Sequence, residues 1–70
     1  MEIAKIVGNN LKVARRAKGY TQKAVAAQMY MTQQQYSRFE NGVFELNYEQ
    51  ILRLCELLDI TPNALFGISL

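Results

Sequence analysis

The chain has 70 residues, of which 50% are hydrophobic and 20% are charged, with a net charge of +2, and this length predicts one domain with a small core. With the single cysteine Cys55 and no histidine, an internal disulfide is excluded and a zinc site lacks ligands. We therefore expect a reducing, cytoplasmic setting and neither a metal nor a cofactor. There is no signal-peptide pattern and no apolar run near the roughly 20 residues of a bilayer span, so we expect no membrane partner.

Residues 1–18 are predicted to form the first helix. Its apolar positions recur at intervals of four, four and three, at Ile3, Val7, Leu11 and Ala14. The segment from Gly8 to Asn10 is the weakest part of this pattern because these residues are poor helix formers. Gly19 suits the left-handed position that ends a helix. Arg15 and Arg16 lie in the last turns, where the helix dipole favours cations and where phosphate contact is the functional alternative.

Residues 21–42 are predicted to form two short helices joined by a tight turn. Thr21 can cap the first of them, and Thr32 with Gln35 can form a capping box at the start of the second, which spans roughly residues 33–41. The apolar positions have the spacing of inward helix faces: Val25, Ala26, Met29, Tyr36 and Phe39. This arrangement is a helix-turn-helix pattern.

The outward positions of the second of these helices are unusual in composition. They are Gln33, Gln34, Gln35, Ser37 and Arg38. An ordinary solvated helix carries mainly Glu and Lys, whereas amides and a guanidinium suit hydrogen bonds to base edges. Gln pairs with adenine in two hydrogen bonds, and Arg pairs in the same way with guanine O6 and N7. The pattern therefore predicts a helix presented to the major groove of DNA.

The remaining chain predicts two further helices. After a loop at residues 43–46, Asn47 can cap a helix from Tyr48 to about Leu58. Its apolar face comprises Ile51, Leu54, Leu57 and Leu58. Thr61 and Pro62 begin a last short helix over residues 63–66, which Gly67 ends. No segment has strand periodicity, so the sequence predicts an all-α fold of five helices in a single domain, residues 1–70.

Charge is distributed unevenly along the chain. Residues 1–38 hold seven of the eight basic residues but one acidic residue, whereas residues 39–70 hold one basic and five acidic residues. Such a distribution gives the domain a preferred face for a polyanion. The alternative interpretation is chance segregation on a solvated surface.

Several short motifs resemble those of a known family. They are GYTQ at 19–22, Ala26, the core positions Tyr36 and Phe39, and FENG at 39–42. From about Val7 to Phe66 the sequence resembles the phage repressor and Cro-type helix-turn-helix family, also called the xenobiotic-response-element (XRE) type. The resemblance implies a compact five-helix bundle of the lambda-repressor-like type, in which helices two and three form the helix-turn-helix at 21–42.

The resemblance also implies roles for individual residues toward double-stranded DNA. Gln33, Gln34 and Arg38 are expected to face base edges. The residues expected to contact the DNA backbone or the flanks of the site are Gln22, Lys23, Thr32, Gln35, Ser37 and Arg16. For Gln22 the alternative role is to brace the helix at 33–41, here called the reading helix. Arg15 and Glu40 match a buried ion pair that ties the reading helix to the first helix.

The turn between the motif helices and the loop after the second of them depart from the family pattern. The turn between the motif helices usually carries Gly, and here it carries Tyr30. A bulky residue at positive φ is strained, so we expect either a rebuilt turn or tolerated strain. The loop after ENG is often basic, whereas here it is Val43-Phe44-Glu45, which cannot add much affinity for DNA.

Apolar residues late in the chain predict a second interface. Leu65 and Phe66 are expected to close the core, which leaves Val43, Phe44, Ile68 and Leu70 for a partner. We expect a symmetric homodimer on a pseudo-palindromic operator, with its reading helices about 34 Å apart.

The function class that this pattern favours is DNA binding rather than catalysis. The chain has no histidine, no Gly-rich phosphate loop and no convincing carboxylate pair, and Cys55 belongs to an apolar helix face. The sequence favours a nucleoid-associated transcriptional regulator, more often a repressor than an activator. The alternative is an antitoxin or another protein-interaction module that uses its apolar loop to bind a protein partner.

Overall fold

The computed structural model describes residues 2–68 and has five helices there. They are α1 (Ile3–Ala17), α2 (Gln22–Gln28), α3 (Gln33–Glu40), α4 (Tyr48–Leu58) and α5 (Pro62–Phe66). No strand occurs in this range, so the predicted all-α class is confirmed. None of these helices is both long and apolar enough to cross a bilayer.

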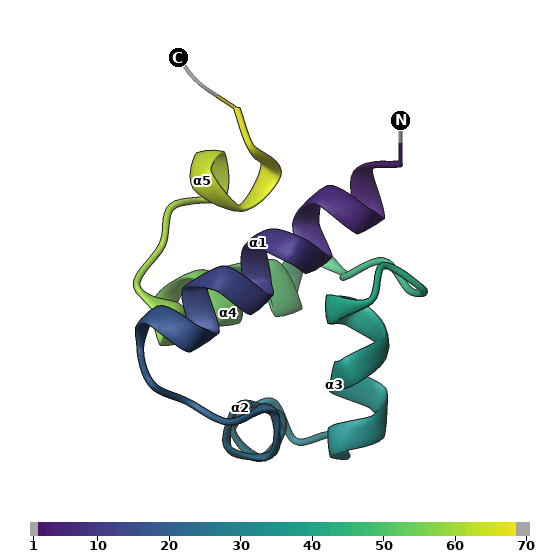
Figure 1. Ribbon diagram of the computed structural model, residues 1–70, viewed down its shortest axis with the longest axis vertical. Helices are drawn as coiled ribbons and strands as arrows, with labels where there is room; N and C mark the ends of the chain where they lie inside the picture. Colours follow the sequence, from purple (N-terminus) through teal and green to yellow (C-terminus); the bar gives the residue numbers. More distant parts are fainter. Residues whose placement is uncertain (1, 69–70) are drawn as a thin grey trace.

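Helix α1 is the central element of the fold. It packs against α3, α4 and α5, and α2 packs against α3. In the view of Figure 1, α1 and α4 overlap across the middle, with α5 above them and with α2 and α3 below. The two motif helices therefore lie together at one end of the molecule, away from α5.

The helix starts follow from local capping by polar side chains. The hydroxyl of Thr21 accepts a hydrogen bond from the Ala24 backbone N–H at the start of α2, and that of Thr61 caps α5 in the same way. Capping boxes open α3, between Thr32 and Gln35, and α4, between Asn47 and Gln50. Each cap satisfies N–H groups that have no partner within the helix.

The core gathers one side chain or more from every helix. The largest fully buried side chains are Tyr36, Leu11, Leu54, Leu58, Leu65 and Val25. Leu65 closes the core from α5, and burial of a leucine side chain contributes about 1.5–3 kcal/mol. The predicted stripe of α1 is wrong at its first member, since Ile3 is 62% exposed. At the start of α1, Ile3 borders an open hollow rather than packing beneath another helix.

Gly8 allows α1 and α3 to approach closely. A Cβ atom at this position would lie 2.5 Å from the carbonyl oxygens of Phe39 and Glu40, at the end of α3. No side chain can occupy that space without a backbone shift. The residue that weakens the helical pattern of α1 is thus the one at which α3 crosses it.

Candidate nucleic-acid interface

The turn between α2 and α3 keeps the geometry expected for glycine although it carries Tyr30. Tyr30 has φ of 57°, and the Met31 N–H donates to the Ala26 carbonyl at 3.0 Å. A non-glycine residue in this left-handed region costs about 1–2 kcal/mol. The Arg53 guanidinium of α4 lies 5.2 Å from the centre of the Tyr30 ring, a contact that offsets part of this cost.

Glu40, at the end of α3, fixes the orientation of that helix. Its side chain is almost fully buried and accepts hydrogen bonds from two helices. Arg15 of α1 donates from Nε to Oε2 at 2.7 Å and from Nη2 to Oε1 at 3.1 Å. Gln22 of α2 donates from Nε2 to Oε1 at 3.0 Å. One carboxylate therefore ties α3 to both α1 and α2.

The ionisation of Glu40 follows from these contacts. Burial by itself would raise the pKa of this carboxyl, but the hydrogen bonds and charge of Arg15, with a further hydrogen bond from Gln22, outweigh burial and hold the pKa below its ordinary value. The hydrogen bond to Glu40 raises the pKa of Arg15, against the effect of its own burial. Both groups are consequently charged at neutral pH.

The opposite face of α3 is exposed and polar. Gln33, Gln34 and Arg38 are exposed. The side-chain hydrogen bonds of α3 within residues 2–68 involve Gln35, Ser37 and Glu40, and none engages the amides of Gln33 and Gln34. These amides keep their hydrogen-bonding capacity for a ligand. Because Glu40 anchors the inner face, the outer face has a fixed orientation relative to the rest of the domain.

Arg38 lies in the last turn of α3 and makes a contact that the sequence did not predict. Its guanidinium carbon lies 5.6 Å from the centre of the Phe44 ring, in the loop that follows α3. Phe44 in turn packs edge-on against Phe39, with ring centres 6.4 Å apart and an interplanar angle of 63°. A signal for this contact exists in the sequence only as an aromatic residue six positions after Arg38.

Comparison with known families decides the class of this domain. A family model described as helix-turn-helix matches residues 11–65, which is most of the chain. The chain belongs to the XRE or lambda-repressor-like helix-turn-helix family. Neither a curated protein nor a solved structure matches it. Members of this family bind DNA and are typically not enzymes.

In this helix-turn-helix domain, two of the residues expected near the DNA backbone are exposed cations, and the other four have side chains that form hydrogen bonds within the protein. Lys23 at the start of α2 and Arg16 near the end of α1 are exposed, and no ion pair among residues 2–68 engages either of them. Gln22 is half-buried, and its amide hydrogen-bonds to Glu40, which is the bracing contact rather than a free phosphate ligand.

Three further flanking residues are engaged within the helix-turn-helix itself. The Gln35 side chain accepts from the Thr32 N–H at 2.9 Å, and the Thr32 hydroxyl accepts from the Gln35 N–H at 3.1 Å. The Ser37 hydroxyl lies 3.4 Å from the Asn41 amide nitrogen. Thr32 and Gln35 thus stabilise the start of α3, and they remain exposed on its surface.

An apolar hollow of about 250 Å³ lies beside the last turns of α3, where Phe39 lines it. Ile3 of α1, Phe44 of the loop and Tyr48 of α4 border it. Of the residues expected at a second interface, Val43, Phe44 and Ile68 are exposed, by 63%, 49% and 52%. Leu70, the fourth of them, lies outside the described residues.

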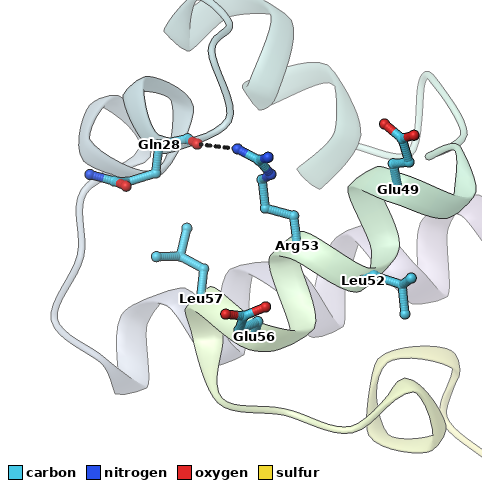
Figure 2. A pocket seen from close by; sticks show the side chains of 6 residues that line it. All are labelled: Gln28, Glu49, Leu52, Arg53, Glu56 and Leu57. Carbon is cyan, nitrogen blue, oxygen red and sulfur yellow. Dashed lines mark hydrogen bonds between the residues drawn. The ribbon is translucent and has the colours of Figure 1, made fainter.

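A larger hollow, of about 660 Å³, lies over α4 and the end of α2. Figure 2 shows Arg53 crossing it from α4, with Nη1 3.5 Å from the Gln28 carbonyl oxygen. The carboxylates of Glu49 and Glu56 lie at separate ends of this part of α4 (Figure 2) and do not form a pair. No residue of α3 lines this hollow, so it lies apart from the polar face of that helix.

Proposed function

We propose that this protein binds a specific double-stranded DNA sequence and regulates transcription. Repression is the favoured role, and activation is the alternative. The observation that carries the proposal is the two-sided character of α3. Its inner face is anchored through Glu40, and its outer face offers Gln33, Gln34 and Arg38 to solvent. A helix held on one side and polar on the other suits insertion into the major groove.

In this proposal the three outward side chains read base edges. Gln33 and Gln34 each have an amide able to pair with adenine N6 and N7, and Arg38 pairs with guanine O6 and N7. Ser37 and Gln35 lie at the flanks of the site. The lack of competing hydrogen bonds at Gln33 and Gln34 within residues 2–68 supports these roles.

Backbone contacts come from the basic half of the chain. Lys23 and Arg16 are exposed cations on the two helices next to α3. Contacts with phosphates set the register of a protein on DNA without reading sequence. Gln22 and Glu40 support the reading helix instead, and Thr32 opens it beside the phosphates.

We further propose that two copies bind together on a pseudo-palindromic operator. Val43, Phe44 and Ile68 are exposed apolar residues, and Phe44 borders the hollow beside α3. A second copy would cover them. Two reading helices about 34 Å apart then meet successive major grooves on one face of DNA. Sedimentation that gives a monomer at high concentration, with and without DNA, would contradict the dimer.

The second candidate function is an antitoxin or another protein-interaction module. The apolar hollow of about 250 Å³ is the observation that favours it, because exposed apolar surface commonly marks a protein interface. A fold kept only for protein contact has no need of Gln33, Gln34 and Arg38 on one face. An antitoxin that also binds its own promoter would use both surfaces.

Selection of bound duplexes from a random pool at moderate salt tests the proposal. The expected result is an inverted repeat whose half-site centres lie about one helical turn apart. A pool that stays random, with binding that disappears as salt rises, would mean that the basic half attracts phosphate without reading sequence. The search would then turn to a protein partner for the hollow.

A further inference from the structure

The loop after α3 is joined to the reading helix at Arg38 by its backbone. The Val43 N–H donates to the Arg38 carbonyl at 2.9 Å, and the Gly42 N–H donates to the Phe39 carbonyl at 3.1 Å. These bonds return the chain toward the last turn of α3. These two hydrogen bonds fix the loop backbone directly before Phe44.

Phe44 then makes two side-chain contacts with the same turn. Its ring packs edge-on against Phe39, which is half-buried beside the core, and the Arg38 guanidinium lies over it at 5.6 Å from the ring centre. Phe39 therefore supports the ring from one side while Arg38 covers another. The ring lies between two hollows, the apolar one of about 250 Å³ and one that Arg38 and Gln35 border.

The contact between Arg38 and Phe44 does not use the N–H donors of the guanidinium. A cation–π contact places the cation over the face of the ring and consumes none of its N–H donors, whereas guanine O6 and N7 accept hydrogen bonds from those N–H groups. An unrestrained arginine side chain loses rotamer freedom when it orders on a base. A ring that orders Arg38 beforehand reduces that loss.

We propose that Phe44 is a positioning residue for base reading, which holds the Arg38 guanidinium in the orientation that a guanine requires. This inference rests on the proposed function, since it assigns Phe44 a part in the same site. It also explains why an apolar residue occupies a loop where the family often carries a phosphate-binding cation.

The contact between the Arg38 guanidinium and the Phe44 ring can be tested in the free protein. The ring should shift the NMR signals of the Arg38 side-chain Nε–Hε group and δ protons upfield. We expect this shift in the wild type and in Phe44→Tyr, and its loss in Phe44→Leu, which keeps apolar bulk against Phe39 without a π face. Arg38 signals that are the same in wild type and Phe44→Leu would overturn the proposal.

A double-mutant cycle tests the consequence for DNA, with the selected wild-type duplex as the probe. Phe44→Leu should weaken binding about two- to five-fold, the range of an exposed cation–π contact, and reduce the preference for the base pair that Arg38 reads. Phe44→Tyr keeps the aromatic ring and should therefore retain both the wild-type affinity and the preference for that base pair. In the Arg38→Ala background, Phe44→Leu should have no further effect.

Val43→Ala is the matched control, because Val43 is exposed in the same loop and offers no aromatic ring to Arg38. Any effect of this change should be equal in both backgrounds. An equal loss for Phe44→Leu in both backgrounds would mean that Phe44 acts through association of two copies, and would overturn the positioning role.

Two further outcomes separate this inference from the proposed function. If wild type selects no preferred duplex, the proposed function fails and this inference fails with it. If wild type selects a duplex but Arg38→Ala binds it like wild type, base reading by Arg38 fails.

Discussion

The Arg15 guanidinium and the Glu40 carboxylate meet edge to edge between α1 and α3, through hydrogen bonds of 2.7 and 3.1 Å. A third donor of Arg15, Nη1, bonds to the Tyr20 carbonyl at 2.9 Å. The pair is buried, so each charge depends on the other to offset the loss of water. A buried pair of this kind adds little net stability, but removal of one partner is costly.

Glu40→Gln should therefore destabilise the fold strongly. The amide removes the charge and leaves the Arg15 guanidinium buried without a counter-ion, which costs about 3–5 kcal/mol. Urea unfolding followed by circular dichroism measures this loss, and a largely unfolded variant agrees with the expectation for so small a domain. Glu56→Gln, at an exposed position of α4, is the control and should change little. Equal midpoints for the two variants would contradict the account.

Stability should also fall in acid because of Glu40. Its pKa is lowered in the folded protein, so its contribution is complete above the ordinary glutamate pKa of about 4.3 and is lost as pH falls toward the lower folded value. The free energy of unfolding should thus decrease below about pH 4. An NMR titration of the Glu40 side-chain carboxyl carbon should give a midpoint below the ordinary value, and a midpoint above it would be inconsistent with the ion pair.

Gly8→Ala should destabilise the protein although alanine favours helix formation. The added Cβ would meet two backbone oxygens of α3 at 2.5 Å, and overpacking of this kind typically costs about 1–3 kcal/mol. Asn9→Ala, at the next and exposed position of α1, should leave stability unchanged or slightly raised. Thermal unfolding of both variants makes the comparison. Melting of Gly8→Ala at or above the wild-type temperature would show that α1 and α3 do not cross so closely.

The local features of this fold could be predicted because each depends on a few neighbouring residues. Thr21, Thr32 and Asn47 cap helices through side chains that reach only three positions along the chain, and Gly19 and Gly42 end helices at positive φ. The core positions of α2 and α3 follow from helical periodicity for the same reason. These features gave the five helices nearly residue by residue.

Contacts between distant segments were harder to predict. Ile3 continues the apolar stripe of α1 but remains exposed, because periodicity does not say where the neighbouring helices end. The support of the Tyr30 turn by Arg53, and of Arg38 by Phe44, depends on where α4 and the loop lie in space. The bracing role of Gln22 likewise depends on the position of Glu40, which lies 18 residues away in the sequence and accepts its hydrogen bond.

Lys23→Ala should weaken binding to all duplexes alike. The loss of one phosphate contact should reduce the slope of log K against log salt concentration by about one, without a change in base preference. Lys18→Ala is the matched control, because the Lys18 ammonium lies 3.7 Å from the Asp59 carboxylate in the turn after α4 and should leave the slope unchanged. A change of base preference in Lys23→Ala would assign this residue a different role.

Base reading by α3 is the central claim, and the binding of Arg38→Ala to single-base-pair variants of the selected duplex tests it most directly. The account predicts that discrimination is lost at one base pair of each half-site, by about 1–3 kcal/mol, and kept elsewhere. Unchanged discrimination at every position would show that Arg38 does not read a base and would contradict the account, and a uniform loss of affinity beside it would indicate a backbone contact instead.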